Sequence, residues 1–439
     1  MKALVAVDVR GPAAGCQWGW SRKEEALNRF ANVETALAAL ERGESVVVLD
    51  PREPEKGAAL VLAAETATPE SVAFMVRHTS GIVSVGLPGS RLDTLELPLM
   101  VPGTPRIPLA VSVDTRQGTT TGISASDRAT TIRALADPRT RPLDLSRPGH
   151  VFPIRTTKGG TLVREAHAEA AVDLARLAGR APAAALCELV NGDGSLADGG
   201  EADRFARRHG LALVSIADLV AYRLRTEALL QQVAAARIPT PHGEYQAVAY
   251  RSSFDDAEHV AMVKGEVTGR EEILVRVQSQ CLLGEAFGSL ACDCGPSLNR
   301  ALAMIAGEGR GVVVYLRGHE GEGTGLGHEL ESARVRNAGR NTSDIRADAG
   351  CHEYGLAAQV LAALDVRSIR LLTDDPRTAR GLKAAGAVVR NQIPLIPPPG
   401  WGARGRPASG DSNAVRVHGT LGVWGDEGSP KVALGGGTR

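Results

Sequence analysis

The chain has 439 residues, and its 50 Lys plus Arg are balanced by 50 Asp plus Glu. A chain of this length predicts roughly two to three domains, each with its own core. The balanced charge excludes a global basic surface for nucleic acid or anionic membranes, and an aromatic content of 3% argues against base stacking. No apolar run reaches the ~18 residues of a membrane span, and Asp8 interrupts the apolar start, so we expect a cytoplasmic protein.

After an N-terminal extension over residues 1–32, helix-like stretches alternate with short apolar strands up to about residue 223. This alternation is typical of α/β or α+β packing. The pattern predicts helices over 34–43, 70–78 and 167–179, and strands over 45–50, 81–86, 109–114, 182–190 and 211–216.

Residues 224–241 contain few helix breakers before Pro239 and Pro241, which predicts a connecting helix and a domain boundary near 235. A second mixed block follows, with strands expected over 244–250, 259–265, 273–279, 311–318 and 369–375, and helices over 297–309 and 355–365. Residues 397–439 form a Gly/Pro-rich tail. We therefore predict two mixed α/β domains in tandem, 33–235 and 236–396, each with a central sheet flanked by helices.

Three of the six cysteines are close together: Cys281, Cys292 and Cys294 form a C-x10-C-x-C pattern. Three thiolates can occupy three corners of a tetrahedral zinc site and leave the fourth open for water, as in catalytic zinc sites. Water on zinc ionises near neutral pH and becomes a nucleophile. The alternative is that these are separately buried thiols, because free cysteine is often buried.

The sequence around this cluster resembles GTP cyclohydrolase II over about 240–396, in RVQSQCLLGEAFGSLACDCG, GEGRGVVVYLRGHEGEGTGL, AAQVLAALDV and IRLLTDDP. Upstream, LDPREPEKGAALVLAAE, RHTSGIVSV, TTGISASDRATTIRAL, RPGHVFP, REAHAEAAVDLARLAG and ALCELVNGDG resemble 3,4-dihydroxy-2-butanone-4-phosphate synthase over about 33–223. In this order, the two halves resemble the fused bifunctional riboflavin-biosynthesis enzyme. The resemblance implies small phosphorylated substrates and a homodimer.

For the second half, the resemblance implies that zinc hydroxide attacks C8 of the guanine ring of GTP, that formate leaves and that pyrophosphate is lost. The resemblance implies that the three cysteines are the zinc ligands. It also implies that Arg276 binds phosphate, that Glu320 recognises the guanine edge and that Thr373 contacts the nucleotide. His352 stands at the position of the family arginine that accepts the α-phosphate. The chain departs from the family pattern at four positions. The family has arginine where this chain has Glu322, the proton-donating tyrosine where it has Ala333, aspartate where it has Gly350 and lysine where it has Thr378. Near His352 the alignment also allows Arg346 or Asp348. A purely structural zinc is the alternative.

For the first half, the resemblance implies that ribulose 5-phosphate is enolised, rearranged and cleaved to formate and a four-carbon ketone phosphate. Glu55 and His167 match the ligands of Mg²⁺ or Mn²⁺, His150 and Glu188 match the acid–base residues, and Arg164 matches a phosphate contact. Taken singly, Glu55 is also compatible with a surface carboxylate, and the two histidines with core residues. The departures in the acidic loop are Pro54, Lys56, Gly57, Ala58 and Ala59, which remove two carboxylates and one arginine of the family pattern. Two further departures are Ser84 for a cysteine and Ala168 for a threonine.

Three hypotheses follow. The chain is a working riboflavin-type enzyme, a diverged paralogue whose metal sites act on a related sugar phosphate or purine nucleotide, or a non-catalytic nucleotide-binding scaffold. The complete cysteine triad and the set Glu55, His150, His167 and Glu188 favour an enzyme. The substitutions in both halves favour an altered substrate over efficient parental turnover.

Overall fold

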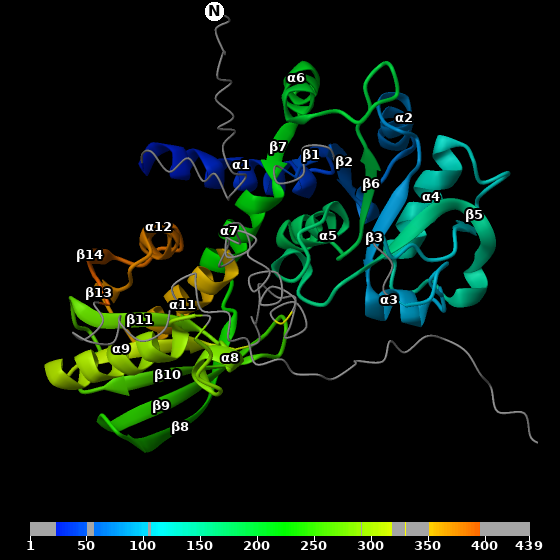
Figure 1. Ribbon diagram of the computed structural model, residues 1–439. Coiled ribbons are helices and arrows are strands. Elements are labelled where there is room, and N and C mark those ends of the chain that lie inside the picture. The colour runs from blue at the N-terminus through cyan, green and yellow to red at the C-terminus, as the bar shows by residue number, and fades with distance from the viewer. Residues whose placement is uncertain are drawn as a thin grey trace, which may run out of the picture. The chain divides into compact units, whose positions relative to one another are not determined.

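The computed structural model describes residues 23–50, 57–103, 107–290, 292–317, 330 and 351–395, and within them the strands form two seven-stranded sheets (Figure 1). The strand order of the first sheet is β4-β5-β3-β6-β2-β1-β7. Its strands are β1 (Val46–Leu49), β2 (Ala58–Ala63), β3 (Ser84–Pro88), β4 (Val113–Thr115), β5 (Leu145–Thr156), β6 (Ala184–Glu188) and β7 (Ala212–Ser215). The helices of this half are α1 (Lys23–Glu41), α2 (Pro69–His78), α3 (Gly89–Thr94), α4 (Ala125–Ala136), α5 (His167–Leu177), α6 (Gly199–His209) and α7 (Ile216–Thr226), with short 3-10 turns at Ala64–Thr66, Pro142–Asp144 and Gly160–Leu162.

Strand β2 lies inside this sheet, and all of its side chains are buried. Successive side chains of a strand point to opposite faces. Ala59 and Val61 accordingly belong to a cluster with residues of α1, α5 and α7, whereas Leu60 and Leu62 belong to a cluster with residues of α2, α4 and α6. Helices thus cover both faces of the sheet, which explains why β2 is a continuous apolar run.

The second sheet has the order β14-β13-β11-β12-β10-β9-β8. On one face, Val313 packs with Ile305 of α9, and on the other, Val312 and Val314 belong to the cluster that contains Leu356 of α11. The strands are β8 (Leu230–Thr240), β9 (Gly243–Ser252), β10 (Glu258–Lys264), β11 (Ile273–Ser279), β12 (Gly311–Leu316), β13 (Ile369–Leu372) and β14 (Val389–Ile393), and the helices are α8 (Leu282–Glu285), α9 (Cys294–Glu308), α11 (Cys351–Ala363) and α12 (Pro376–Ala384).

The connecting helix expected over residues 224–241 is wrong. Helix α7 ends at Thr226, and Leu230–Thr240 form β8, an edge strand of the second sheet. Strand β8 pairs with β9 as an antiparallel hairpin from Leu230 to Thr240, with one register shift between Gln232 and Ala234. The ladder hydrogen bonds of this hairpin override the helix propensity of the Ala and Gln residues, and an edge strand tolerates Pro239. The second sheet therefore begins before the expected boundary at 235.

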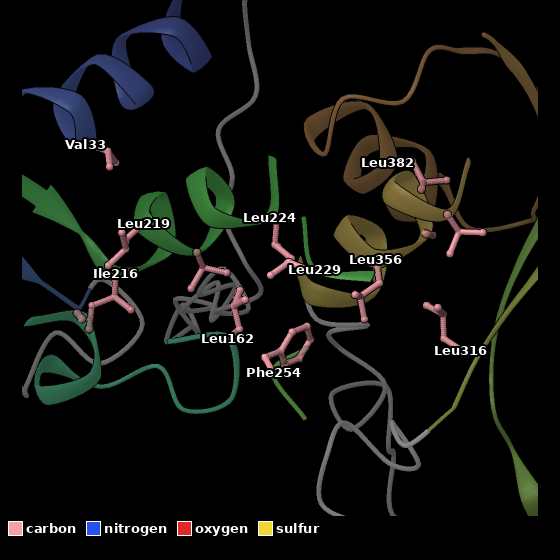
Figure 2. Close-up of a cluster of buried hydrophobic side chains, with 14 of the residues drawn as sticks. Val33, Leu162, Ile216, Leu219, Leu224, Leu229, Phe254, Leu316, Leu356 and Leu382 are labelled. Atoms are coloured by element: carbon pink, nitrogen blue, oxygen red, sulfur yellow. The ribbon is translucent and has the colours of Figure 1, made fainter. Parts of the chain in front are cut away.

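Side chains of both halves meet around the segment that joins them. Leu224 and Leu229, on either side of this junction, share a hydrophobic cluster with Leu356 of α11 (Figure 2). The Gln359 side chain on α11 donates to the carbonyls of Leu224 at 2.8 Å and Glu227 at 3.0 Å, and accepts from the Leu229 N–H at 3.0 Å. The described residues, from Lys23 to Leu395, belong to one compact unit. Helix α11 thus fixes the path of the chain between the two sheets.

The expected fold class, two mixed α/β regions each with a central sheet flanked by helices, is confirmed by these two sheets. The helix expected from residue 34 begins earlier, at Lys23, inside the expected N-terminal extension. Residues 397–439, expected to form a tail, lie outside the described residues. None of the helices described has both the length and the apolar character needed to cross a bilayer.

Candidate active sites

The candidate site of the second half lies where three parallel strands end. Strand β11 runs parallel to both β12 and β13, so the carboxyl ends of all three meet at one edge of the sheet. Cys281 follows β11, Arg317 follows β12 and Thr373 follows β13. Ligands of open α/β sheets bind at this edge, and the expected residues Cys281 and Thr373 are both placed there.

The three cysteines come together at this edge. Cys281 precedes the short helix α8, and Cys294 is the first residue of α9, with Cys292 just before it. Their sulfur atoms all lie within 4.8 Å of one another, and the Sγ atoms of Cys281 and Cys292 are 3.6 Å apart. Two sulfurs on a tetrahedral zinc are about 3.8 Å apart, given Zn–S bonds of about 2.3 Å. The three thiols therefore fit three corners of a zinc site.

The surroundings of the thiols also fit a cation. A Cβ on Gly284 would lie 2.4 Å from the Sγ of Cys292 and 3.1 Å from that of Cys281, so only glycine leaves room for the cluster. Burial raises the pKa of Cys281 to about 11, and the hydrogen bond from Cys292 together with burial raises the pKa of Cys294. Because protein alone disfavours the thiolates, a divalent cation is the natural partner that ionises them.

A polar network lies beside the cysteines. The Arg276 guanidinium donates to the Leu372 carbonyl at 3.0 Å and to the Gln278 side chain at 2.8 Å. Gln278 donates to Glu285 at 2.8 Å, and the Tyr315 hydroxyl donates to the same carboxylate at 2.5 Å. Burial, followed by the Glu285 hydrogen bond, raises the pKa of Tyr315. Arg276, expected as a phosphate contact, is thus anchored between two strands beside the thiols.

His352 lies in the first turn of α11. Its Nε2 is 3.4 Å from the Glu165 carboxylate of the first half, and Ser279 donates to the neighbouring Glu353 at 2.6 Å. The remaining expected positions of this half, Glu320, Glu322, Ala333, Arg346, Asp348 and Gly350, lie outside the described residues.

In the first sheet, strand register brings His150 and Glu188 to one level on either side of β3. Ser84 of β3 pairs with Phe152 of β5, which is parallel to β3, and with Leu186 of β6, which is antiparallel. His150 comes two residues before Phe152, and Glu188 comes two residues after Leu186, so both lie beyond Ser84 in the same direction and on the same face. With strands ~4.8 Å apart, their backbones are about 10 Å apart.

The third expected residue of this site, His167, begins α5 on that same face. Leu186 belongs to the cluster that contains α5, and a Cβ on Gly86 of β3 would lie 2.9 Å from the Ala168 carbonyl oxygen. The first turn of α5 thus lies directly on the centre of the sheet. His150, Glu188 and His167, although far apart in the sequence, share one face and one region of the first half.

Arg164 is held by a carboxylate that the sequence analysis did not single out. Its Nη2 lies 2.5 Å from Oε1 of Glu169, a residue with no exposed surface, and the same oxygen accepts the Thr157 N–H at 3.1 Å. Burial raises the pKa of Glu169, and Arg164 partly offsets this effect. The arginine expected to bind phosphate is therefore positioned from α5, next to His167.

Glu55 and Lys56 lie outside the described residues. The strand that follows them, β2, pairs Ala59 with Glu188. The Glu188 side chain is exposed, and its carbonyl accepts the Ser80 N–H at 2.9 Å. The strand that follows the expected acidic ligand in the sequence therefore lies next to the expected acid–base residue.

Comparison with known proteins decides the family. Residues 34–222 match the 3,4-dihydroxy-2-butanone 4-phosphate synthase family, and residues 231–394 match the GTP cyclohydrolase II family. The riboflavin biosynthesis protein RibBA of Salinispora arenicola is 50% identical over 385 residues, which cover 85% of this chain and 91% of the relative. The chain belongs to this family of fused riboflavin-biosynthesis proteins. RibBA of Nocardia farcinica, 49% identical over 381 residues, covers 84% of this chain and is itself covered to 91%.

Among solved structures, RibBX from A. baumannii, described as a two-domain 3,4-dihydroxy-2-butanone 4-phosphate synthase, superposes with a TM-score of 0.66 at 31% identity and covers 82% of this chain and 99% of its own. Family membership confirms the expected resemblance of both halves and makes the chain a bifunctional riboflavin-biosynthesis enzyme with a lyase half and a hydrolase half. The matches give no support to the paralogue or scaffold hypotheses.

Residue-by-residue reading missed the partners that hold the synthase residues. Asp114 contacts His150 through both of its carboxylate oxygens, and Glu169 holds Arg164. Asp114 and His150 are 36 residues apart, and only the pairing of β4 with β5 brings them together. Glu169 contacts Arg164 across the start of α5, where the sequence does not show that the carboxylate turns back toward the arginine.

Proposed function

We propose that the synthase half converts ribulose 5-phosphate to formate and a four-carbon ketone phosphate, and that the cyclohydrolase half opens the imidazole ring of GTP. The observation that carries this proposal is the group of three thiols around Gly284 at the carboxyl ends of three parallel strands. A closed structural zinc would need a fourth protein ligand, whereas three ligands leave one position open to water.

In the synthase half, we assign His150 and Glu188 to proton transfer at the sugar carbons. They share one face of the sheet at about 10 Å backbone separation, room enough for a five-carbon substrate between them. Arg164, fixed by Glu169, binds the phosphate through its remaining donors. His167 and Glu55 would hold Mg²⁺ or Mn²⁺, which stabilises negative charge on the substrate oxygens. Of these two ligands, the described residues include His167, at the start of α5 and on the face that the acid–base pair shares.

In the cyclohydrolase half, Cys281, Cys292 and Cys294 would hold zinc, which supplies an activated water as the nucleophile for the purine ring. Arg276 and Thr373, at the same sheet edge, are assigned to the nucleotide, and Glu320 to the donors of the guanine edge. His352 is assigned to the α-phosphate. Its contact with Glu165 is a carboxylate–imidazole pair, an arrangement that orients a histidine for proton or phosphoryl chemistry.

We further propose a cytoplasmic homodimer with a domain junction at residues 227–229. The junction follows from the end of α7 and the start of β8. Exposed apolar residues near the synthase site, including Ile82 at 62% and Ile123 at 55% exposure, support coverage by a second copy. Among the described residues, Cys187, Cys281, Cys292 and Cys294 form no disulfide, which is typical of a reducing compartment. Light scattering on the purified chain tests the dimer.

Formate release tests both activities, because each reaction expels formate. The chain is supplied with GTP and with ribulose 5-phosphate separately, in the presence of Zn²⁺ and Mg²⁺. Cys292→Ala should lose zinc and formate release from GTP while keeping release from ribulose 5-phosphate, and His150→Ala should show the opposite pattern. Each variant thus carries its own folding control. Release from neither substrate by the wild-type chain would refute the proposed function.

A further inference from the structure

The Asp114 carboxylate contacts both the imidazole and the backbone of His150. The His150 Nδ1 lies 2.8 Å from Oδ2 of Asp114, and the backbone N–H of His150 donates to Oδ1 of Asp114 at 2.9 Å. The Asp114 side chain is 11% exposed, whereas that of His150 is 41% exposed. The carboxylate is thus buried behind a ring that remains accessible, and it fixes both the backbone and the ring of the same histidine.

Two glycines make this contact possible. A Cβ on Gly149 of β5 would lie 2.0 Å from the Val113 carbonyl carbon, so only glycine lets β4 come close enough to place Asp114 against His150. Gly122, with φ of +86°, lies against the pair itself: a Cβ there would be 2.0 Å from Oδ2 of Asp114 and 2.7 Å from Nδ1 of His150.

The loop that contains Gly122 is fixed by a second carboxylate. Asp127, at 4% exposure, accepts the Gly122 N–H at 3.0 Å and the Thr120 hydroxyl at 2.9 Å. The neighbouring Arg128 is 7% exposed, and although burial lowers its pKa, the charges of Cys187 and Asp114 partly offset this. The buried Arg128 guanidinium therefore lies within electrostatic range of the Asp114 carboxylate.

An ionised carboxylate can only accept hydrogen bonds, so the ring nitrogen that faces it must carry the proton. We propose that Asp114 is the positioning residue of the synthase half: it holds His150 as the Nδ1–H tautomer, which leaves Nε2 as the proton acceptor for the sugar phosphate, and Gly122 preserves the space for this pair. The inference rests on the proposed acid–base role of His150 and extends it to the residues that set its tautomer.

Asp114→Asn is the direct test. The amide keeps the shape of the side chain and can still accept the His150 N–H, but it offers an N–H at the former Oδ2 position and so forces the proton onto Nε2. Turnover of ribulose 5-phosphate should fall by about 10²- to 10⁴-fold in kcat, while KM changes by less than about threefold. Formate release from GTP should stay unchanged, which controls for folding.

A pair of glycine variants separates this role from backbone strain. Gly118, in the same loop, has φ of +76°, and a Cβ there would make only an ordinary contact with Thr130 at 3.7 Å. Gly118→Ala and Gly122→Ala therefore share the cost of a left-handed alanine. We expect Gly122→Ala alone to lose about tenfold or more in kcat for ribulose 5-phosphate. Equal losses in the two variants would refute the steric role of Gly122.

The tautomer can be read directly from ¹⁵N-histidine NMR of the free chain, with His150→Gln to assign the signal. The expected result is a protonated Nδ1 in the wild type and a protonated Nε2 in Asp114→Asn. A wild-type His150 protonated on Nε2, or an Asp114→Asn variant with kcat within threefold of wild type, would overturn the proposal. Because the wild-type spectrum needs no turnover, a chain that releases no formate from ribulose 5-phosphate would refute only the proposed function.

Discussion

Gly284 is in such close contact with Cys292 that a Cβ on the glycine would lie 2.4 Å from the cysteine sulfur. Gly284→Ala must therefore push the thiols apart. We expect zinc affinity to fall by about tenfold or more, because misplaced ligands and lost supporting contacts typically cost this much. Competition with a chromophoric chelator measures the affinity, and the spectrum of the cobalt-substituted chain reports the geometry.

Gly307, in helix α9 of the same half, is the matched control for this substitution. A Cβ there would have no neighbour within 4 Å, so Gly307→Ala should leave metal binding unchanged and stabilise the helix slightly. Equal zinc affinity in Gly284→Ala and the wild-type chain would count against a metal site at these cysteines.

A buried ion pair ties α5 to α7. Asp173 accepts from Arg223 at 2.7 Å and from the backbone N–H of Thr161 at 2.7 Å, and both charged residues are 4% exposed. Asp173→Ala leaves Arg223 with Glu227 as its remaining carboxylate partner, at 2.6 Å, and takes the acceptor away from the buried Thr161 N–H, so we expect a loss of about 2–3 kcal/mol in the free energy of unfolding. Asp137→Ala, which breaks an exposed pair with Arg139, should cost under about 1 kcal/mol. Urea unfolding of both variants checks the contrast.

Two histidines and two phenylalanines cluster between α2 and α6. The His78 and His209 ring centroids are 4.9 Å apart, and Phe74 lies 4.6 Å from His78. Burial, followed by repulsion from His209 and Arg77, lowers the pKa of His78 below its ordinary value of 6.5. The unfolded chain therefore binds this proton more readily than the folded chain, so stability falls as the pH drops through 6.5 toward the lowered value.

Substitution of His78 by glutamine tests this sign. Between pH 7.5 and pH 5.5, the melting temperature of His78→Gln should fall less than that of the wild-type chain. Glutamine binds no proton in this range, so the destabilisation that comes from protonation of His78 in the unfolded chain is absent. An identical decrease for both chains would show that the cluster does not contribute to the pH dependence.

Arg164 depends on Glu169 for its position, at a distance of 2.5 Å. Glu169→Gln keeps the size of the side chain and removes its charge, which weakens a charge-assisted hydrogen bond. We expect KM for ribulose 5-phosphate to rise by about tenfold, with a smaller change in kcat. Glu165→Gln removes a nearby carboxylate that contacts His352 instead and should leave this KM unchanged. A similar KM effect in both variants would show that the region responds only to lost charge.

Sequence alone predicted the elements whose apolar runs are long and bounded by turns. The strand predicted over 311–318 is observed as Gly311–Leu316, and the helix predicted over 297–309 is observed as Cys294–Glu308. The helix over 224–241 was wrong because Ala and Gln favour a helix locally, whereas a neighbouring strand supplies partners for the backbone. Helix propensity reflects only interactions between residues that are near one another in the sequence. A short stretch of sequence therefore does not show that its backbone will pair with another strand.

In the candidate sites, too, the contacts between residues close in sequence were predictable and those between distant residues were not. The cysteine triad is predictable because its three members lie within 14 residues, so spacing carries the geometry. The contact between Asp114 and His150 spans 36 residues and depends on two glycines that let the strands approach. Gly122 and Gly149 matter because they have no Cβ, and the sequence around them does not show which groups lie in the space that a Cβ would fill.

Gln359 makes three hydrogen bonds to the junction between the halves, and Leu224, Leu229 and Leu356 share one apolar cluster beside it. Two enzymes joined by a loose tether would melt independently, each at its own temperature. In this chain, unfolding of either half exposes to water the leucines of the other half in this cluster. Calorimetry of the whole chain should therefore show a single cooperative transition, and a gene cut at residue 228 should yield two poorly soluble fragments.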